Sequence, residues 1–210
     1  MGEYELHSFI LACDFRVDDT AAMWEWLTKH RQGLSDIGAH HVVLYESIWE
    51  PRRVLVTIGI RHPQSIRDVL RSPAIFEWFN ISGAADIPPI FGGEVVEKID
   101  LHSGSPERPP GDVVLGVMTS VEDVAALMVK VHDGLDRFQR GGVRQVWVYR
   151  ALDDGHEVLI LQQLADEASA RQWIEHPDAA AEWMTIAGLG PYPSRFVGRL
   201  THLMTVDQQG

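Results

Sequence analysis

The feature that most constrains the fold is a repeat that runs through almost the whole chain. Shifted by 104 residues, positions 11–73 align with 115–177 without a gap, and thirteen of the 63 pairs are identical. The identical pairs include Asp19 with Asp123, Gly38 with Gly142, Tyr45 with Tyr149 and Arg67 with Arg171. One extra residue near Asp178 changes the offset to 105, after which the match resumes. Each half must therefore make sense as one structural unit.

Hydrophobic periodicity predicts the same order of elements, β-α-β-β-α-β, in both halves. In the first half the predicted strands and helices cover 6–15, 18–34, 40–49, 52–61, 62–79 and 92–101. In the second half they cover 112–120, 121–138, 144–152, 156–164, 166–183 and 198–206. Asp18 or Asp19 is the expected N-cap of the first helix. The order is that of a ferredoxin-like unit, an antiparallel sheet with two helices on one face.

A stretch rich in Pro, Gly and Ser, HSGSPERPPG, separates the halves and is typical of a linker. We therefore predict a ferredoxin-like repeat at 1–101, a linker at 102–111 and a second repeat at 112–206. A single unit of this kind leaves one sheet face bare, and a second copy can cover it. The expected fold class is α+β, with two ferredoxin-like βαββαβ repeats packed sheet to sheet as a single-chain α+β barrel.

Composition narrows the partners and the compartment. The formal net charge of −12 argues against nucleic acid and against an anionic membrane surface, since both need a basic face. Cys13 is the single cysteine, so no intrachain disulfide can form. The chain starts without a basic segment followed by an apolar run, and no apolar run is long enough to cross a bilayer. These features favour a cytoplasmic protein.

The βαββαβ order over both halves resembles the dimeric α+β barrel superfamily, which includes antibiotic-biosynthesis-type monooxygenases and small haem-degrading enzymes. The segment DEASARQWIEHPDAAAEW, residues 166–183, is similar to the second helix of the monooxygenase-type members. The resemblance covers nearly the whole chain and implies that one chain supplies both halves of the barrel, as a tandem duplication. It also implies a small-molecule site between helices and sheet.

The haem-degrading members' residues do not carry over to this chain. Those enzymes have an Asn on the first strand, where this sequence has Ala12 and Cys13. They place an axial His nine residues after a helix Trp, a position that Glu182 holds here, and a carboxylate is a poor haem ligand. We therefore expect no cofactor. Haem held by His176 or His202 is the alternative.

Candidate catalytic residues lie on the final strand of each half. Glu97 and His202 occupy matching positions among apolar neighbours, and an ionisable group there costs energy unless it is paired. If the two approach each other they form an acid–base pair; the alternative is that both are satisfied structural groups. Five further residues are candidates for binding an aromatic substrate, namely Tyr45, Tyr149, Trp147, Trp173 and Arg171. For the tyrosines, packing on the sheet is the alternative.

Three further observations concern a metal site, the single cysteine and the size of the cavities in the two halves. His40 and His41 are consecutive on a strand, so their side chains are expected on opposite faces, and no His or Cys spacing is typical of a metal site. Cys13 aligns with Val117 and is expected to be a small core residue. Trp173 stands where the first half has Val69, so the two halves are not expected to have equal cavities.

We therefore expect a small-molecule-binding protein, a cofactor-independent monooxygenase-like enzyme that acts on an apolar or aromatic compound. A non-catalytic binding or regulatory barrel is one alternative, and a haem-binding protein is the other. The fused barrel could also form a homodimer. The enzyme interpretation comes from the resemblance, because a fold alone does not determine a function.

Overall fold

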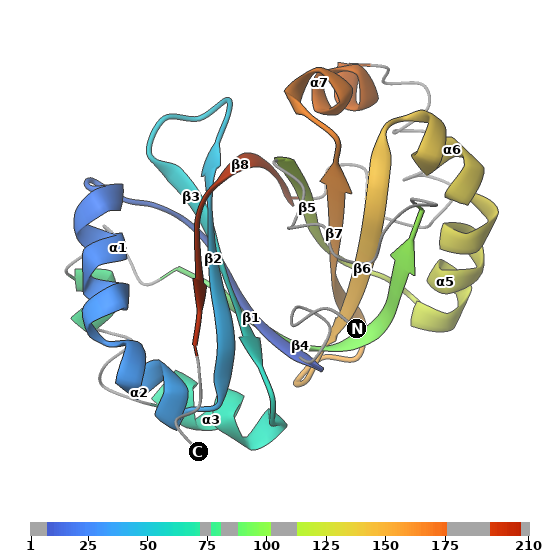
Figure 1. The fold of residues 1–210 in the computed structure, drawn as a ribbon. Coiled ribbons are helices and arrows are strands. Elements are labelled where there is room, and N and C mark those ends of the chain that lie inside the picture. Colours follow the sequence, from blue (N-terminus) through green and yellow to red (C-terminus); the bar gives the residue numbers. More distant parts are fainter. Residues whose placement is uncertain (1–7, 72–76, 81–87, 102–112, 176–193, 207–210) are drawn as a thin grey trace. The chain divides into compact units, whose positions relative to one another are not determined.

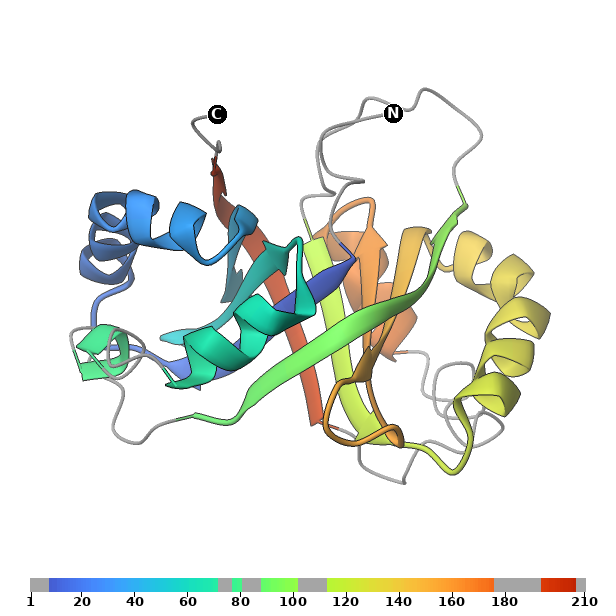
Figure 2. The same cartoon turned by 90° about the horizontal axis from the view of Figure 1, so that it is seen from below.

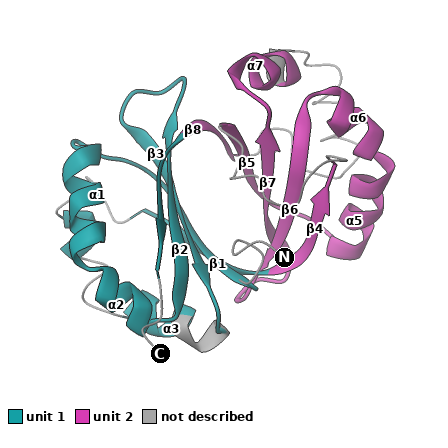
Figure 3. Ribbon diagram, in the orientation of Figure 1, with its two compact units in different colours: residues 1–94, 200–210 teal, residues 95–199 magenta. Residues whose placement is uncertain are grey.

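The structure, a computed structural model, describes residues 8–71, 77–80, 88–101, 113–175 and 194–206. The chain forms two compact units, shown in Figure 3. Unit 1 comprises Met1–Glu94 and Leu200–Gly210, and unit 2 comprises Val95–Arg199. The predicted linker at 102–111 lies outside the described residues, as does His176.

The described elements follow the predicted order in each half (Figure 1). The first half has β1 (Phe9–Arg16), α1 (Thr20–Lys29), α2 (Arg31–Asp36), β2 (Ala39–Ser47), β3 (Arg53–Ile60), α3 (Pro63–Arg71) and β4 (Ile90–Asp100). The second half has β5 (Val113–Ser120), α5 (Val124–Asp133), α6 (Leu135–Arg140), β6 (Val143–Ala151), β7 (Glu157–Leu164), α7 (Glu167–Glu175) and β8 (Ser194–Thr205).

The strands are hydrogen-bonded in the order β1-β3-β2-β8-β5-β7-β6-β4. Because β4 also pairs with β1, this order is cyclic, as a single-chain α+β barrel requires. The pairs β1–β3, β1–β4, β2–β3, β5–β7, β5–β8 and β6–β7 are all antiparallel. The α+β class with ferredoxin-like halves is therefore confirmed.

The final strand of each half is divided between the two units, because the unit boundaries fall inside β4 and β8. Both strands are long, β4 in green and β8 in red in Figure 2. β4 begins beside β1 in unit 1 and continues from Val95 in unit 2, where the next amide, Leu101 N–H, donates to the carbonyl oxygen of Arg144. β8 likewise begins beside β5 in unit 2 and ends in unit 1, where Val206 N–H donates to the carbonyl oxygen of His40. The boundaries of the compact units therefore differ from those of the predicted repeats, 1–101 and 112–206. The division of the chain into these two repeats stays a prediction.

Matching residues of the repeat have matching structural roles. Asp19 caps α1 by accepting a hydrogen bond from the amide of Ala22, and Asp123 caps α5 by accepting from the amides of Ala125 and Ala126. Gly38 and Gly142 follow the ends of α2 and α6 with φ of 76° and 83°, a region that favours glycine. The predicted helix at 18–34 is two helices, because α1 ends and α2 begins around His30.

The strand register decides which side chains face the helices of unit 1. Leu11 lies opposite Ile58, and Cys13 lies opposite Val56. All four line a cavity with residues of α1, α2 and α3, so this face of the sheet is covered by the helices. Neighbouring residues on a strand alternate between faces. Tyr45 pairs with Leu55, next to Val56, and therefore lies on the opposite face.

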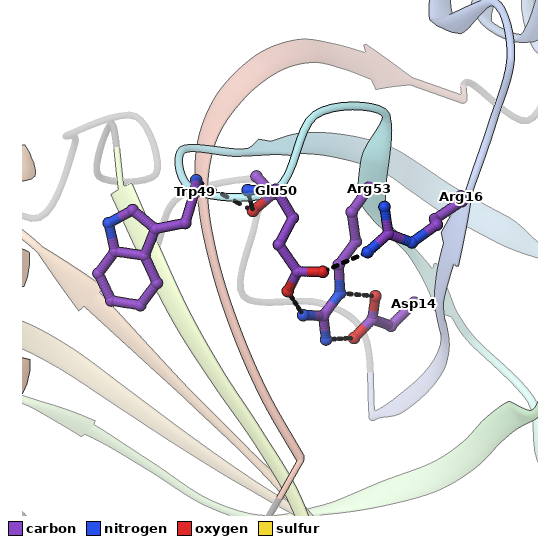
Figure 4. A network of polar contacts seen from close by, with 6 residues as sticks. Asp14, Arg16, Trp49, Glu50 and Arg53 are labelled. Atoms are coloured by element: carbon purple, nitrogen blue, oxygen red, sulfur yellow. Dashed lines mark hydrogen bonds and ion pairs between the residues drawn. The ribbon is translucent and has the colours of Figure 1, made fainter.

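A network of charged groups ties the β2–β3 hairpin to β1 (Figure 4). The guanidinium of Arg53 donates two hydrogen bonds to the carboxylate of Asp14, at 2.8 and 2.5 Å. Arg53 also contacts Glu50, and Arg16 donates to the other oxygen of Glu50 at 2.5 Å. The hydroxyl of Ser47 accepts from the amides of Trp49 and Glu50, which orders the turn.

Within the described residues, no helix combines the length and the apolar character that crossing a membrane would need.

Candidate functional site

An apolar cavity of about 260 Å³ lies in unit 1 between the sheet and its helices. Side chains of β1 and β3 form one wall, and residues of α1, α2 and α3 form the other. Most of these lining groups are aliphatic side chains, and Leu27, Leu34 and Val69 are among the buried ones. His30, Gly33 and Asp36 are exposed, so they mark the side of the cavity that faces solvent.

His30 is placed by the break between the two helices. It is the C-cap of α1, and both its amide and its imidazole Nδ1 lie within hydrogen-bond distance of the carbonyl oxygen of Trp26, at 3.0 and 2.8 Å. The imidazole is thus a second partner of a carbonyl that already accepts the amide of the same residue. His30 is the imidazole among the residues that line this cavity.

This contact determines which ring nitrogen of His30 can accept a proton. A carbonyl oxygen only accepts, so in the neutral ring Nδ1 carries the hydrogen and donates it to Trp26. Nε2 then holds the lone pair. A neutral imidazole beside an apolar cavity can act as a general base towards a bound molecule.

Two indole rings border the same cavity. Trp26 stacks on the His30 ring with centroids 4.0 Å apart and an interplanar angle of 22°. Trp78 is buried and packs edge-on against Phe15 at 5.4 Å, and its N–H has no partner in the described structure. Flat aromatic walls favour a flat aromatic ligand.

Cys13 lies in the wall of the cavity but is not suited to act as a nucleophile. Burial raises the pKa of its thiol, and the nearby charge of Asp14 raises it further. The thiol therefore stays protonated, whereas a nucleophilic cysteine needs its thiolate. Its sulfur lies 3.5 Å from the carbonyl oxygen of Pro89, which agrees with the expected core role.

Trp173, a predicted substrate-binding residue, lies in unit 2 on α7, and its side chain is buried at 5% exposure. Its ring packs edge-on against Phe138 with centroids 5.8 Å apart. The same ring covers Gly141 so closely that a Cβ on that glycine would lie 2.3 Å from ring atom Cε3.

The predicted catalytic residues, Glu97 and His202, belong to different units and have their contacts inside their own unit. The Glu97 carboxylate accepts from Nε2 of His132 on α5 at 3.0 Å. The His202 ring packs on Trp24 of α1, with centroids 4.7 Å apart. Their equivalence is visible in these contacts, because each residue lies against the first helix of the other half. Their catalytic role stays a prediction.

The remaining predicted binding residues do not line the unit 1 cavity. Tyr45 is buried on the other sheet face, and burial raises the pKa of its hydroxyl. Trp147 stacks on Tyr149 with centroids 6.0 Å apart, and the ammonium of Lys98 lies 4.6 Å from the Trp147 ring. Arg171 is exposed on α7 and pairs with Glu167 at 2.9 Å. A binding role for these four also stays a prediction.

The expectation that His40 and His41 point to opposite faces of the strand is wrong. Their Nδ1 atoms lie 3.1 Å apart, and both side chains are buried. The pairing of β2 with β3 shifts register between Ala39 and His41, and such a bulge interrupts the strict alternation of faces. The described residues contain no group of three or more His, Cys, Asp or Glu side chains that could hold a metal ion.

Sequence reasoning missed His30 and Trp78 as site residues. The repeat held a signal for His30, because the matching residue of the second half is Gly134, which has no side chain. A polar residue present in one half alone is a reasonable candidate for a role that the other half does not share. Trp26 had a similar signal, since the second half has Lys130 at that position.

Several solved structures have a fold similar to that of this chain, and the similarity covers nearly all of its residues. An anthrone oxidase-like protein has a TM-score of 0.70 and 14% identity, over 100% of this chain and 97% of that one. A ferredoxin-fold protein from Listeria monocytogenes, related to antibiotic biosynthesis monooxygenases, has a TM-score of 0.51 and 13% identity, over 94% and 97% of the two chains. A heme-binding protein from Thermus thermophilus has a TM-score of 0.54 and 14% identity, over 94% and 92%.

These structures confirm the expected resemblance to antibiotic-biosynthesis-monooxygenase-like α+β barrels at the level of the fold. No protein-family model matches the chain, and no curated protein matches it either.

Proposed function

We propose that the protein binds a flat aromatic molecule in the unit 1 cavity and oxygenates it with molecular oxygen, using His30 as the base. The observation that carries this proposal is the position of His30, whose Nδ1–H is held by the Trp26 carbonyl beside an apolar cavity. Sites for drug-sized ligands occupy about 300–1,000 Å³. A cavity of about 260 Å³ therefore suits a small fused-ring compound.

The polarity of the cavity orients such a substrate. The buried side chains of β1, β3 and α3 offer apolar contacts for the ring system, while His30 and Asp36 lie at the exposed edge. The ionisable group of the substrate would remain at that edge, next to His30, because burial of a charge without a partner is costly. The name of the structurally similar anthrone oxidase-like protein refers to a substrate of this class.

The proposed reaction balances without a resident cofactor. Nε2 of His30 takes a proton from the acidic methylene group of an anthrone-type substrate, which leaves an electron-rich carbanion. The carbanion reduces molecular oxygen, a C–O bond forms, and loss of water from the hydroperoxide gives a ketone. In sum, one oxygen atom becomes the ketone oxygen, the other leaves as water with the two methylene hydrogens, and His30 returns the proton it took. General-base help of this kind contributes about 10²–10⁴-fold to a rate.

Haem stays the alternative from the sequence, and its iron would need a ligand such as the imidazole of His30, which lines this cavity. No step of the proposed reaction passes through haem.

The test is oxygen uptake by the purified full chain with anthrone as substrate, in the presence of a metal chelator and after subtraction of the uncatalysed rate. We expect His30→Gln to lower kcat about 100-fold or more. The dissociation constant of anthrone should change only a few-fold, because the apolar walls are intact. His132→Gln, a substitution of a half-exposed His outside the cavity, should leave kcat unchanged.

Two results would contradict the proposal. Full activity of His30→Gln, combined with a large loss in Glu97→Gln, would favour the pair predicted from the sequence. Binding of anthrone by the unchanged protein without any oxygen uptake would favour the non-catalytic binding barrel.

A further inference from the structure

Six of the fifteen positions that line the unit 1 cavity can be compared with their equivalents in unit 2, while others, such as Ala12 with Gly116 and Leu27 with Val131, have the smaller side chain in the second half. At the offset of 104, the six pairs are Cys13 with Val117, His30 with Gly134, Leu34 with Phe138, Ile37 with Gly141, Val56 with Ile160 and Val69 with Trp173. Four of the six positions carry a larger side chain in the second half. At the other two positions the second half has glycine. Gly134 replaces the imidazole of His30, and Gly141, which replaces Ile37, leaves space for the ring of Trp173.

The two halves differ at a pair of contacting positions: the second half has Trp173 and Gly141 where the first half has Val69 and Ile37. The indole lies against the bare backbone of Gly141, and a Cβ there would approach ring atom Cζ3 to 2.8 Å as well as Cε3. Real Cβ atoms do not come this close, so the ring can take this position only because residue 141 is glycine. Trp173 is 5% exposed and Phe138, which it contacts, is fully buried. The space between α7 and the end of α6 is therefore occupied by the chain's own aromatic ring.

Unit 1 has the opposite arrangement at the same two positions. Val69 on α3 and Ile37 at the end of α2 are both shorter than an indole, and both line the open cavity. Where unit 2 has a ring that reaches from one helix to the other, unit 1 has two aliphatic side chains with space beside them. A flat ring brought in by a ligand would take up that space and remain in contact with both.

We infer that the chain binds one flat, fused-ring aromatic molecule, in unit 1, and that the indole of Trp173 takes the corresponding place in unit 2. The inference depends on the proposed function only in that the unit 1 cavity is a ligand site, and it does not depend on oxygenation. It also explains the difference between His30 and Gly134. A half whose cavity is filled by the chain itself has no ligand for a base to act on.

The test counts binding sites with indole itself, by isothermal titration calorimetry of the full chain. The unchanged protein should bind one equivalent. Trp173→Val should bind two, because a cavity left by an aromatic side chain in a packed core accepts a matching aromatic molecule. The double variant Val69→Trp with Ile37→Gly gives unit 1 the same Trp and Gly that fill the space in unit 2, so it should bind no indole. Circular dichroism of each variant establishes that it is folded.

The outcomes separate this inference from the proposed function. Two equivalents bound by the unchanged protein, or one bound equivalent that persists in the double variant, would overturn the inference and leave oxygenation by His30 open. No binding of indole would overturn the inference and leave the proposed function to its own test with anthrone. One bound equivalent of indole, without oxygen uptake when anthrone is supplied, would overturn the proposed function alone. Should Trp173→Val fail to fold, the double variant in unit 1 still decides where the bound indole lies.

Discussion

The imidazole Nδ1 of His30 lies 2.8 Å from the carbonyl oxygen of Trp26, one helical turn earlier, and the two rings stack at 4.0 Å. The main-chain oxygen of Trp26 thus orients the base, while its side chain forms part of the cavity wall. These two roles can be separated by substitution, because a substitution of the side chain leaves the carbonyl in place.

Trp26→Leu should therefore weaken the binding of anthrone and leave the turnover of bound substrate nearly unchanged. An aromatic pair contributes about 0.5–1.5 kcal/mol beyond its buried area, which corresponds to a roughly 2- to 10-fold rise in Kd. Trp24→Leu on the same helix is the control, since Trp24 packs on His202 and is not part of the cavity lining. A fall in kcat of the size expected for His30→Gln would contradict the separation.

Gly141→Ala should destabilise the protein by about 1–3 kcal/mol, the usual cost of overpacking a core. The new methyl group would meet the ring of Trp173, which is rigid and buried. Adding Trp173→Val should remove most of this extra cost in a double-mutant cycle followed by urea unfolding. Gly33→Ala is the control, because nothing lies within 4 Å of its added Cβ and alanine suits a helix.

Arg53→Ala should lower the free energy of unfolding by about 1–3 kcal/mol, between the values for exposed and buried ion pairs. The Arg53 and Asp14 side chains are only 18% and 17% exposed, and removal of the guanidinium leaves the Asp14 carboxylate without its two hydrogen bonds. Arg16→Ala breaks a pair whose members are 63% and 40% exposed, so it should cost less than about 0.5 kcal/mol. Equal costs for the two variants would refute the argument from burial.

Arg52→Gly should stabilise the protein by roughly 0.5–1 kcal/mol, since a left-handed backbone costs a residue with a Cβ about 1–2 kcal/mol and glycine very little. Arg52 has φ of 66° in the turn between β2 and β3. Its ion pair with Asp18 is exposed and adds little. Arg52→Ala loses the same ion pair but keeps the left-handed residue, so its midpoint of thermal unfolding should not rise.

Asp166 should make the stability of unit 2 sensitive to acid. The Asp166 carboxylate accepts a hydrogen bond from the amide of Ser169 at 2.8 Å at the start of α7, and this contact lowers the pKa of the carboxyl. A lowered pKa stabilises the fold above the ordinary value of about 3.9. That contribution is lost as the pH falls through the lower value of the folded state. The difference in urea midpoint between the natural chain and Asp166→Asn should shrink below about pH 4 and stay constant above about pH 6.

Much of the fold could be predicted because its signals are local. Asp19 and Asp123 cap helices through their own side chains, and Gly38 and Gly142 take a backbone conformation that glycine tolerates best. Repetition strengthened these signals, since the same residue recurs wherever the same local geometry is needed. The bulge beside His41 had no such signal, because a shift in register depends on the neighbouring strand.

The candidate site was harder to predict, because its residues are adjacent only after folding. Glu97 and His202 were recognised as equivalent, yet each final strand crosses into the other unit, so their contacts are His132 and Trp24. His30 is one of ten histidines, and the helix end that orients its ring is formed by tertiary structure that no local sequence pattern predicts.

The sequence by itself determined the two βαββαβ halves, their caps and turns, and the difference between Val69 and Trp173. Only the tertiary structure showed that helices and sheet of unit 1 enclose an apolar cavity and that the imidazole of His30 borders it. Local patterns specify elements because caps, turns and periodicity act within a few residues. Cavities depend on how side chains from distant elements fill shared space, as Trp173 does over Gly141.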